Sequence, residues 1–445
     1  MQTAEDVEKK PFYLKGNFAP VSEEVTAFDL TVRGALPDEI HGSFLRNGPN
    51  PKPGVEPGHW FFGDGMIHGI ALEAGKARWY RNRWVRTRSF LEDVPPISPE
   101  GIRDITNGTA NTHVVGHAGR IFALVESSLP TELTSELETV GPYDFGGRLE
   151  TAMTAHPKIC PRTGELHFFG YHWFEPFLVY HRADARGVLV QSETIEVPGP
   201  TMMHDFAITD SHVVFMDLPI VFDPERALQG TMPYRWSDDY GARLGVMPRG
   251  GTNADLRWYE IEPCYVFHPF NAWSEGGRIV IDVARYETLW RESSGTFESA
   301  RAHRWTIDTA AGRVIETPLD DRAIEFPRVD ERRTGSRHRY GYAAHSGSSV
   351  ESEQTALVRY DLDTGKCDVH EFGPGRHPCE GVFIPAKGGA EDEGWIATFV
   401  YDAARDTSDF VLLDPSRFGS RPQAVMELPQ RVPMGFHGSW VPVEA

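Results

Sequence analysis

Cysteine is scarce in this sequence. Four cysteines occur among 445 residues, Cys160, Cys264, Cys367 and Cys379, and no two of them form a Cys-x-x-Cys pair. Such pairs supply the ligands of structural zinc sites and of most iron–sulfur clusters, so we expect neither kind of site. We interpret all four as small core residues or free thiols. So few cysteines are typical of a reducing compartment.

Long apolar runs and basic charge are also in short supply. No run approaches the 18 apolar residues that a membrane-spanning helix needs, and the opening MQTAEDVEKK lacks the apolar centre of a secretory signal. We therefore expect a cytoplasmic protein. The 44 Lys and Arg residues are outnumbered by 64 Asp and Glu, which gives a net charge of -20. Such a charge disfavours nucleic acid or an anionic lipid surface as a partner held by a basic field.

Nucleotide-binding motifs and helical periodicity are missing too. The chain has no strand-linked Gly-x-Gly-x-x-Gly and no Walker A sequence, which argues against a nicotinamide, flavin or nucleotide cofactor. No amphipathic helix of 10–15 residues alternates with strand-like segments. A βαβ fold is therefore disfavoured.

Short apolar runs between turn residues dominate the chain instead. Segments such as 119–125 (GRIFALV), 277–283 (GRIVIDV) and 394–401 (GWIATFVY) are rich in Val, Ile, Phe and Tyr and are flanked by turn formers. This pattern predicts many short strands and an all-β fold, either a β-propeller or several stacked sandwiches. No Trp-Asp dipeptide occurs, which disfavours the interaction-type propeller. Turns of acidic residues and Gly resemble the outer hairpins of a repeated sheet, at 160–165, 180–187, 307–313 and 361–366.

The pattern predicts a single domain over residues 1–445. Residues 1–40 lack periodicity, and we expect them to form an arm that wraps the domain and closes its last sheet. Residues 126–150 and 223–245 are predicted to be long loops or short helices. Long insertions on one face would build a lid over a central site.

Four of the 18 histidines stand in distinctive contexts. They are His156 in TAHPK, His204 in MMHDF, His268 in VFHPFNAW and His437 in GFHGSW, separated by 48, 64 and 169 residues. These gaps exclude ligands on one helix but fit one ligand per sheet of a radial fold, all directed at the axis. Imidazole suits zinc, copper, iron and nickel alike, so spacing alone leaves the metal open.

Eight blocks in order resemble the carotenoid cleavage oxygenase family, over about residues 15–441. This resemblance implies a seven-bladed β-propeller with a loop or helical cap over an axial metal face. It further implies a non-haem Fe(II) held by His156, His204, His268 and His437. The blocks include FLRNGPNP (44–51), TAHPKICPRTGELHFFGY (154–171), PTMMHDFAITDSHVVFMDLPIVFD (200–223), FHPFNAW (267–273), EFPRVD (325–330) and HGSW (437–440).

The resemblance also implies three glutamates behind the histidines. A carboxylate that accepts the outer N–H of a metal-bound imidazole fixes its tautomer and raises its basicity. Fe(II) and three carboxylates sum to a charge of about -1, so the cluster can be buried. The family usually has Pro after the third glutamate, where this chain has Gly381. The implied pairs are Glu126 with His204, Glu325 with His268, and Glu380 with His437, whereas His156 has no glutamate partner.

The implied reaction is the oxidative cleavage of a conjugated C=C bond by O2, with two carbonyl products and no cofactor besides iron. The predicted enzyme is thus a dioxygenase. Thr112 matches a position where relatives place a small side chain over one open coordination site. Together with Thr112, we expect Val125, Phe267 and Phe90 to bind the substrate. Less specific candidates for an apolar tunnel are Phe61, Phe62, Trp173 and Phe174.

Carotenoid or apocarotenoid is the favoured substrate, and a lignostilbene-type alkene is the alternative. The stilbene-cleaving branch places a Lys just before the first glutamate and a Tyr after VRT, where both grip a phenolic hydroxyl. Here these positions hold Val125 and Phe90, which cannot stabilise a phenolate. An apolar segment at 218–234 is the candidate entrance, with transient membrane contact through apolar residues. A non-catalytic carotenoid carrier and an isomerohydrolase remain further alternatives.

Overall fold

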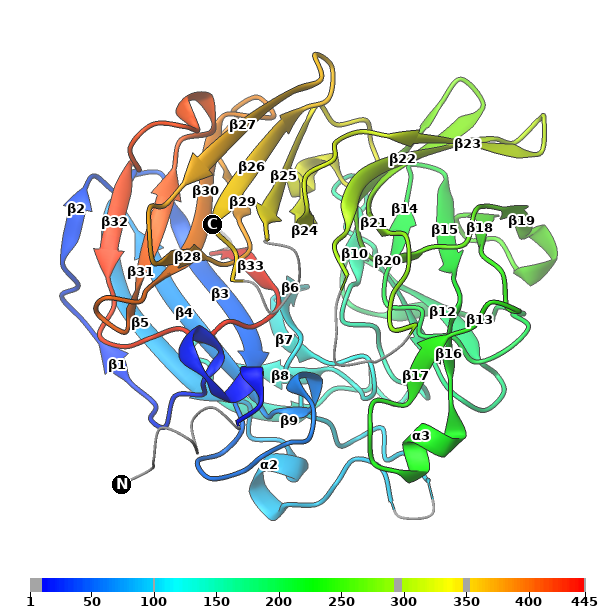
Figure 1. Ribbon diagram of the computed structural model, residues 1–445, viewed down its shortest axis with the longest axis horizontal. Coiled ribbons are helices and arrows are strands. Elements are labelled where there is room, and N and C mark those ends of the chain that lie inside the picture. The colour runs from blue at the N-terminus through cyan, green and yellow to red at the C-terminus, as the bar shows by residue number, and fades with distance from the viewer. Residues whose placement is uncertain (1–9, 99–100, 292–297, 347–352, 444–445) are drawn as a thin grey trace.

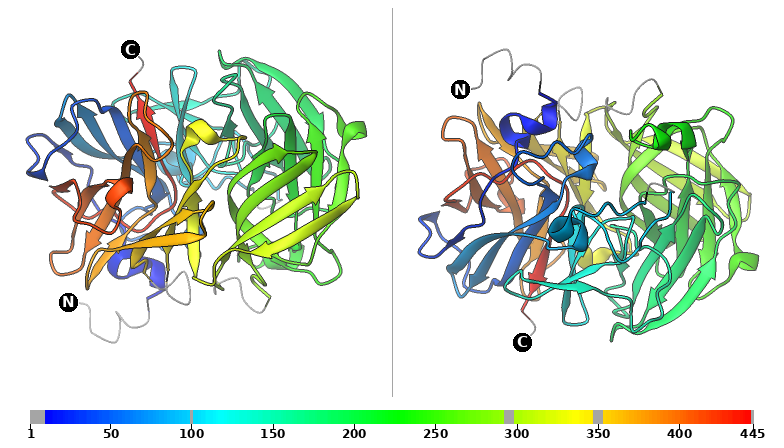
Figure 2. Two further views of the ribbon diagram at one scale, coloured as in Figure 1. Left: turned by 90° about the horizontal axis from the view of Figure 1, so that it is seen from above. Right: turned by 90° about the horizontal axis from the view of Figure 1, so that it is seen from below.

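Seven β-sheets surround a central axis in the computed structural model, which describes residues 10–98, 101–291, 298–346 and 353–443 (Figure 1). Seen along the axis, the sheets follow one another in chain order (Figure 2). Neighbouring strands within each sheet are antiparallel. The predicted all-β fold, a seven-bladed β-propeller, is confirmed. Its short strands arise because Gly, Pro and acidic turns interrupt every apolar run.

The blades that begin in the N-terminal half are built from strands in the following order. The first blade has β1 (Thr26–Ala27), β5 (Lys76–Trp84), β4 (Gly65–Glu73), β3 (His41–Pro49) and β33 (Gly438–Pro442); the second has β6 (His113–His117), β7 (Arg120–Leu124), β8 (Thr131–Leu133) and β9 (Thr139–Pro142); the third has β10 (Lys158–Ile159), β11 (Leu166–Tyr171), β12 (Leu178–Ala183) and β13 (Leu189–Thr194); the fourth has β14 (Phe206–Ile208), β15 (His212–Asp217), β18 (Arg243–Pro248) and β19 (Arg257–Glu260).

The remaining blades come from the C-terminal half, together with one strand from near the N-terminus. The fifth has β20 (Tyr265–Glu275), β21 (Arg278–Tyr286), β22 (Arg301–Asp308) and β23 (Arg313–Pro318); the sixth has β24 (Ile324–Arg328), β25 (Tyr340–His345), β26 (Ala356–Asp361) and β27 (Lys366–Glu371); the seventh has β28 (Arg376–Pro378), β29 (Val382–Pro385), β30 (Gly394–Asp402), β31 (Thr407–Leu413), β32 (Ala424–Glu427) and β2 (Val32–Gly34). A separate hairpin joins β16 (Ile220–Phe222) to β17 (Tyr234–Trp236).

Strands from both ends of the chain close the ring. At the axis, β33 pairs with β3, with Gly438 opposite Arg46. At the periphery, β2 pairs with β32, and β1 pairs with β5. The first and last blades therefore each contain strands from distant parts of the chain, which ties the two ends of the propeller together. The extent of the single domain and of its N-terminal arm stays a prediction.

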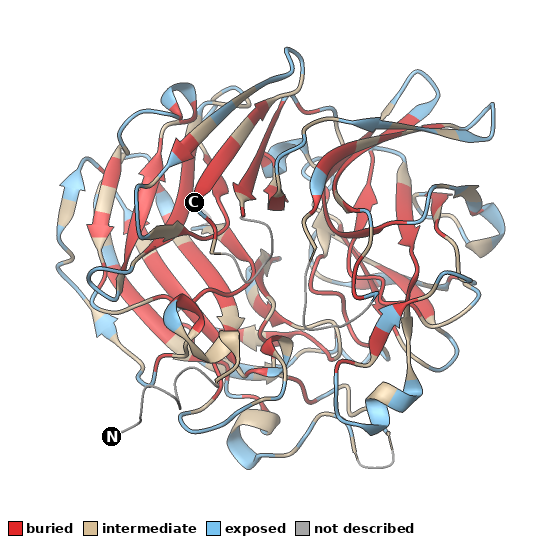
Figure 3. Ribbon diagram, in the orientation of Figure 1, coloured by how far each residue is buried: buried red, intermediate tan, exposed pale blue. Residues whose placement is uncertain are grey.

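The outermost strand of each blade consists mainly of half-buried and exposed residues, whereas most buried residues lie in the strands inside it (Figure 3). Every residue of β11 is buried, whereas β23 alternates between exposed and half-buried positions. Inner strands lie between two neighbouring blades and so need apolar residues on both faces, which explains runs such as LHFFGY in β11. Outer strands present one edge to water and tolerate charged residues.

Parts of the sequence prediction need correction. Residues 126–150 were expected to lack strands, but they contain β8 and β9, the outer half of the second blade. These strands are three and four residues long and contain Thr, Glu, Gly and Pro, so they lack the apolar signature of a strand. The acidic turns at 180–187, 307–313 and 361–366 join the two outermost strands of a blade as predicted, but the turn at 160–165 joins β10 to β11 near the axis.

Short helices gather at the lower end of the molecule in Figure 1. The α-helices of the described ranges are α2 (Arg88–Glu92) and α3 (Pro224–Leu228), each five residues long. No helix within these ranges is both long and apolar enough to cross a bilayer. The implied cap stays a prediction. Residues 223–245 contain the expected short helix, α3, but they also contain strand β17 and the start of β18, which the sequence did not predict. The 3-10 turns are η1 (Phe12–Leu14), η2 (Gly16–Phe18), η3 (Trp60–Phe62), η4 (Asn253–Asp255), η5 (Glu331–Arg333) and η6 (Pro415–Arg417).

Candidate metal centre

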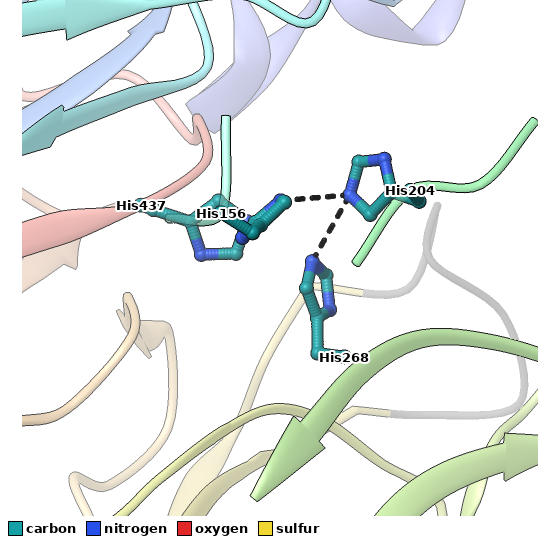
Figure 4. A group of neighbouring side chains, drawn as sticks. All are labelled: His156, His204, His268 and His437. Carbon is teal, nitrogen blue, oxygen red and sulfur yellow. Dashed lines mark hydrogen bonds between the residues drawn. The ribbon is translucent and has the colours of Figure 1, made fainter. Parts of the chain in front are cut away.

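The four singled-out histidines converge at the axis (Figure 4). Their rings are buried, and one nitrogen from each lies within 4.8 Å of the others. The Nε2 atoms of His156 and His204 are 2.9 Å apart, and those of His204 and His268 are 3.3 Å apart. The ring of His437 lies 4.6 Å from that of His156 and 4.6 Å from that of His268. These imidazoles form one cluster that could hold a metal ion.

Each histidine occupies an equivalent place in its blade. His156, His204 and His437 come one or two residues before the innermost strands β10, β14 and β33, and His268 lies near the start of β20. Because these strands run in the same direction along the axis, their first residues meet at the same end of the propeller. At His268 the pairing of β20 with β21 shifts register between Val266 and Pro269, which frees its backbone from regular pairing.

Three glutamates contact the outer nitrogens of three histidines, in the pairs that the resemblance implied. Nδ1 of His204 lies 3.1 Å from a carboxylate oxygen of Glu126. The corresponding distances are 2.6 Å for His268 and Glu325 and 3.0 Å for His437 and Glu380.

Glu380 keeps its contact although Gly381 follows it. The backbone N–H of Gly438 also donates to Glu380, at 2.8 Å. A Cβ atom at position 381 would lie 2.9 Å from Cγ2 of Ile396 and 3.1 Å from Cδ1 of Leu357, so the small residue suits the packing there. The departure from the family pattern therefore leaves the position of the carboxylate intact.

All seven blades contribute to the centre. The seven histidines and glutamates described above come from seven different sheets, and each lies in a strand or within two residues of one. From the first blade to the seventh, they are His437, Glu126, His156, His204, His268, Glu325 and Glu380. This radial arrangement explains why the sequence separations between the histidines are so large.

The chemistry of the nitrogen set fits a metal cation. A carboxylate only accepts hydrogen bonds, so the Nδ1 atoms of His204 and His268 carry the hydrogens and their Nε2 lone pairs face each other. Two lone pairs 3.3 Å apart repel each other unless a metal ion or a proton lies between them. Burial, followed by the neighbouring imidazoles, lowers the pKa of His156 well below its usual range, and burial likewise lowers that of His437. At His204 burial also acts to lower the pKa, but Glu126 outweighs it and raises the pKa of this imidazole. Neutral imidazole is the form that binds metal.

A fourth carboxylate, missed by the sequence analysis, lies behind His156. Oδ2 of Asp205 is 3.8 Å from Nδ1 of His156, and Oδ1 pairs with Nζ of Lys158 at 2.7 Å. Burial raises the pKa of Asp205, and Lys158 opposes that effect. Asp205 directly follows His204 in MMHDF, and Lys158 follows His156 by two residues. The residues were visible in the sequence, but their pairing across two blades was not.

Three more residues around the centre escaped the sequence analysis. His113 is buried, with Nδ1 2.8 Å from the carbonyl oxygen of Ala155, next to His156. Tyr286 donates from its hydroxyl to Oε1 of Glu325 at 2.8 Å. Phe326 stacks on the ring of His268, at 5.6 Å between centroids. Phe326 also has a φ of 54°, a left-handed conformation that costs a bulky residue about 1–3 kcal/mol.

The buried charges balance once these neighbours are included. Asp205 and Lys158 add one charge of each sign, and Nη1 of Arg328 lies 3.5 Å from Glu380. With a divalent cation and the three glutamates, the assembly is then close to neutral rather than -1. Near-neutrality reduces the cost of burying so many ionised groups.

A cavity of about 1060 Å³ reaches the histidine cluster. His204, His268 and His437 form part of its wall. The rest of the wall is mostly apolar, and its volume lies at the upper end of the range usual for ligand sites. The predicted tunnel residues found in this wall are Thr112, Val125, Phe267, Phe61, Phe62, Trp173 and Phe174.

Phe90 is the predicted substrate-binding residue that is not found in this wall. Its ring stacks on Trp84 at 5.7 Å and packs against a small cluster with Val21 and Met66. Its role in binding stays a prediction. The candidate entrance at 218–234 does border the cavity, through Phe222 and residues from Pro224 to Tyr234.

Comparisons with known proteins agree with this geometry. Residues 18–442 match the family described as RPE65, retinal pigment epithelial membrane protein. The chain is 41% identical to the carotenoid cleavage oxygenase of Mycobacterium tuberculosis (strain ATCC 25618 / H37Rv), over 99% of this chain and 100% of that one. This chain therefore belongs to the family of carotenoid cleavage oxygenases. It is an enzyme of the dioxygenase class that the sequence predicted.

Solved structures show the same fold. The lignostilbene dioxygenase of Pseudomonas brassicacearum has a TM-score of 0.89 and 30% identity, over 98% of this chain and 99% of that one. A cobalt-substituted Synechocystis ACO has a TM-score of 0.86 and 26% identity, over 95% of this chain and 97% of that one. The family thus includes a protein named for carotenoids and one named for lignostilbenes, so membership alone leaves the substrate of this chain open.

Proposed function

We propose that this enzyme binds Fe(II) through His156, His204, His268 and His437 and cleaves one conjugated C=C bond of a carotenoid or apocarotenoid. The observation that carries the proposal is the buried histidine cluster at the wall of a large, mostly apolar cavity. Iron, when bound, supplies the activation of O2. One oxygen atom ends on each carbon of the former double bond, so two carbonyl products form and no external reductant is consumed.

The chain's own residues orient the ligands and exclude water. Glu126, Glu325 and Glu380 each accept from a histidine Nδ1 and so hold Nε2 towards the centre. Phe267 packs edge-on against His204, at 5.0 Å between ring centroids. Apolar side chains of this kind hold an alkene close to the centre and keep water out.

Thr112 is proposed to restrict access to the centre from the cavity. It lines the cavity, and its carbonyl oxygen accepts from the backbone N–H of His437 at 3.1 Å. Its hydroxyl donates to Oδ1 of Asn111 at 3.0 Å, which leaves the methyl group as its other substituent. A methyl group beside a ligand would narrow the approach of O2 or substrate to one side.

Val125 supports an apolar polyene as the substrate. It lines the cavity next to Glu126, at the position where the stilbene-cleaving branch has a phenol-binding Lys. Valine offers no hydrogen bond or charge to a phenolate. A stilbene or phenylpropenoid alkene is the second candidate, supported by the likeness to the lignostilbene dioxygenase. Both substrate classes present the same kind of bond to the same centre.

We further propose a cytoplasmic enzyme that contacts membranes transiently to take up an insoluble polyene. Leu228 of α3 and Phe174 line the cavity and are 87% and 65% exposed. Exposed apolar side chains at a cavity mouth can insert into the interfacial region of a bilayer. With a net charge of -20, electrostatic repulsion from anionic lipids would oppose such contact, so it depends on the apolar residues.

Product identification tests the proposal. Protein from iron-replete cells is purified without oxygen, its metal content is measured, and it is incubated with polyenes and hydroxystilbenes under isotopically labelled O2. We expect about one iron per chain and two labelled carbonyl products from an apocarotenoid. Release of hydroxybenzaldehydes alone would favour the second candidate, and protein without any transition metal would contradict the iron site. His268→Ala serves as the control that loses iron and turnover together.

A further inference from the structure

Arg103 is a basic residue in the cavity wall without an acidic partner. Within the part of the chain that the structure describes, Lys52 and Arg103 are the basic residues that line the cavity, apart from histidines. Lys52 is ion-paired with Asp93. For Arg103, no carboxylate among the described residues lies within ion-pairing distance. A guanidinium in a mostly apolar wall without an ion-paired carboxylate is costly to keep and therefore calls for a reason.

The Arg103 guanidinium is held in one position. Its carbon atom lies 4.0 Å from the centroid of the Trp173 ring, and Nη1 donates to the carbonyl oxygen of Tyr171 at 3.1 Å. Its backbone forms an isolated β-bridge with Ile97. Trp173 is in turn stacked on Phe222, with 5.5 Å between ring centroids. These contacts fix the planar group, and the hydrogen bond to Tyr171 uses only one of its five N–H donors.

Two tyrosines and Glu126 lie near enough to Arg103 to interact with it electrostatically. Tyr171 and Tyr234 also line the cavity, and both are buried. Burial raises the pKa of Tyr171 well above its usual range, so its hydroxyl keeps its proton. Arg103 interacts electrostatically with Glu126, the carboxylate that accepts from His204. Arg103, Tyr171 and Tyr234 thus form a polar group within the mostly apolar wall of the cavity.

We infer that Arg103, with Tyr171 and Tyr234, binds an oxygen atom at one end of the substrate. The substrate is then a conjugated alkene with a terminal carbonyl, carboxylate or phenolate oxygen rather than a pure hydrocarbon. A ligand that fills the cavity displaces water from the guanidinium, and a hydrocarbon leaves its N–H groups unpaired. An oxygen acceptor restores a charge-assisted hydrogen bond. This inference rests on the proposed function, because it assigns the class of substrate that the centre cleaves.

Anaerobic binding separates this subsite from catalysis. Quenching of tryptophan fluorescence gives the Kd of an apocarotenal and of the polyene in which a methyl group replaces the aldehyde. A hydroxystilbene and its unsubstituted stilbene form a second pair. We expect the wild-type protein to bind the oxygen-bearing member of at least one pair about 10- to 100-fold more tightly, as for a hydrogen bond to a charged group. Arg103→Met should abolish this preference. Arg186→Met, at a side chain that is 83% exposed, should keep it.

Other outcomes would overturn the inference. Equal affinities for both members of both pairs in the wild-type protein would show that no oxygen is recognised. Equal weakening of both members by Arg103→Met would show that the side chain only packs. If Arg103→Met does not fold, Arg103→Gln replaces it, and an unchanged preference in that variant contradicts the inference. Turnover tests the proposed function separately: selective binding without cleavage refutes the cleavage reaction alone, and cleavage without selectivity refutes the subsite alone.

Discussion

Nδ1 of His268 lies 2.6 Å from Oε2 of Glu325, the shortest of the three histidine–glutamate contacts at the axis. Oε2 also accepts from the backbone N–H of Phe326 at 2.5 Å, and Oε1 accepts from the Tyr286 hydroxyl at 2.8 Å. This buried carboxylate therefore has three donors, and each fixes it from a different direction. Its orientation, and with it that of His268, is determined by the surrounding structure.

Removal of the Glu325 carboxylate should lower the affinity of the centre for its metal ion. Glu325→Ala leaves His268 without its acceptor, and losses of outer acceptors commonly reduce metal affinity 10- to 100-fold. Glu325→Gln keeps the shape and removes only the charge, so a smaller loss is expected. Competition with a chelator measures the affinity. Glu150→Gln, at an exposed side chain away from the centre, is the matched control. Unchanged affinity in Glu325→Ala would show that the contact does not support a metal ligand.

Substitution of the neighbouring buried histidines His156 and His113 should have different effects on iron content. His156→Ala removes a proposed ligand, so iron content and turnover should both fall to background. His113 lies 5.8 Å from His156 between ring centroids but bonds to Ala155 and Ser439 instead of facing the cluster. His113→Gln should therefore retain at least half of the iron. Metal analysis of both purified variants decides, and equal iron loss would contradict the assignment of ligands.

Lys158 is predicted to stabilise the fold through Asp205. Lys158→Met leaves the buried carboxylate of Asp205 unpaired, which should lower the free energy of unfolding by about 3 kcal/mol. We expect the lower end of the usual range, because the Lys158 side chain is 20% exposed. Urea unfolding measures the change. Adding Asp205→Asn should restore part of the loss, since the unpaired charge is then gone. Additive losses in the double variant would rule out coupling of the pair.

Acid should destabilise the protein through buried histidines outside the centre. Burial, followed by Arg249 and Arg182, lowers the pKa of His167 to about 3. Unfolded histidine titrates near 6.5, so below that pH the unfolded chain binds the additional proton. The free energy of unfolding should therefore fall as the pH decreases from 6.5 towards 3, by up to about 1.4 kcal/mol per pH unit for each such histidine.

The variant His167→Gln tests this linkage. Its unfolding free energy, measured by urea titration between pH 4 and 7, should depend less steeply on pH than that of the wild-type protein, by about one proton. His41→Gln, at an exposed side chain, should leave the slope unchanged. Parallel curves for His167→Gln and the wild type would mean that His167 does not carry this dependence.

A single cavity residue should shift the substrate preference. Val125→Lys places an ammonium group in the cavity wall beside Glu126, where it can bind a phenolate oxygen. The ratio of kcat/KM for a hydroxystilbene to that for an apocarotenal should rise at least 10-fold. Val140→Lys, at a side chain that is 62% exposed, controls for added charge. A ratio that stays constant would mean that position 125 does not contact the substrate.

Much of the fold was predictable from local pattern. Apolar runs bounded by Gly, Pro and acidic turns indicate strands, because the backbone must reverse after a few residues and the strands must bury both faces near the axis. The same logic missed β8 and β9, which are short and polar and exist because β7 offers them a paired edge. Tertiary pairing there outweighs the weak strand propensity of TEL and TVGP.

The metal centre was also predictable only in part. The sequence by itself picked out the four histidines and three glutamates that meet at the axis, since each stands in a block that resembles one family. It also determined the absence of a basic field and of nucleotide-binding motifs. The tertiary structure alone decided that seven blades each supply one residue, that Asp205 and Lys158 lie behind His156, and that Phe90 packs against Trp84 instead of lining the cavity. The number of residues between two positions does not tell how far apart they lie in a closed ring of blades. These contacts therefore form only in the complete propeller, in which the last blade meets the first.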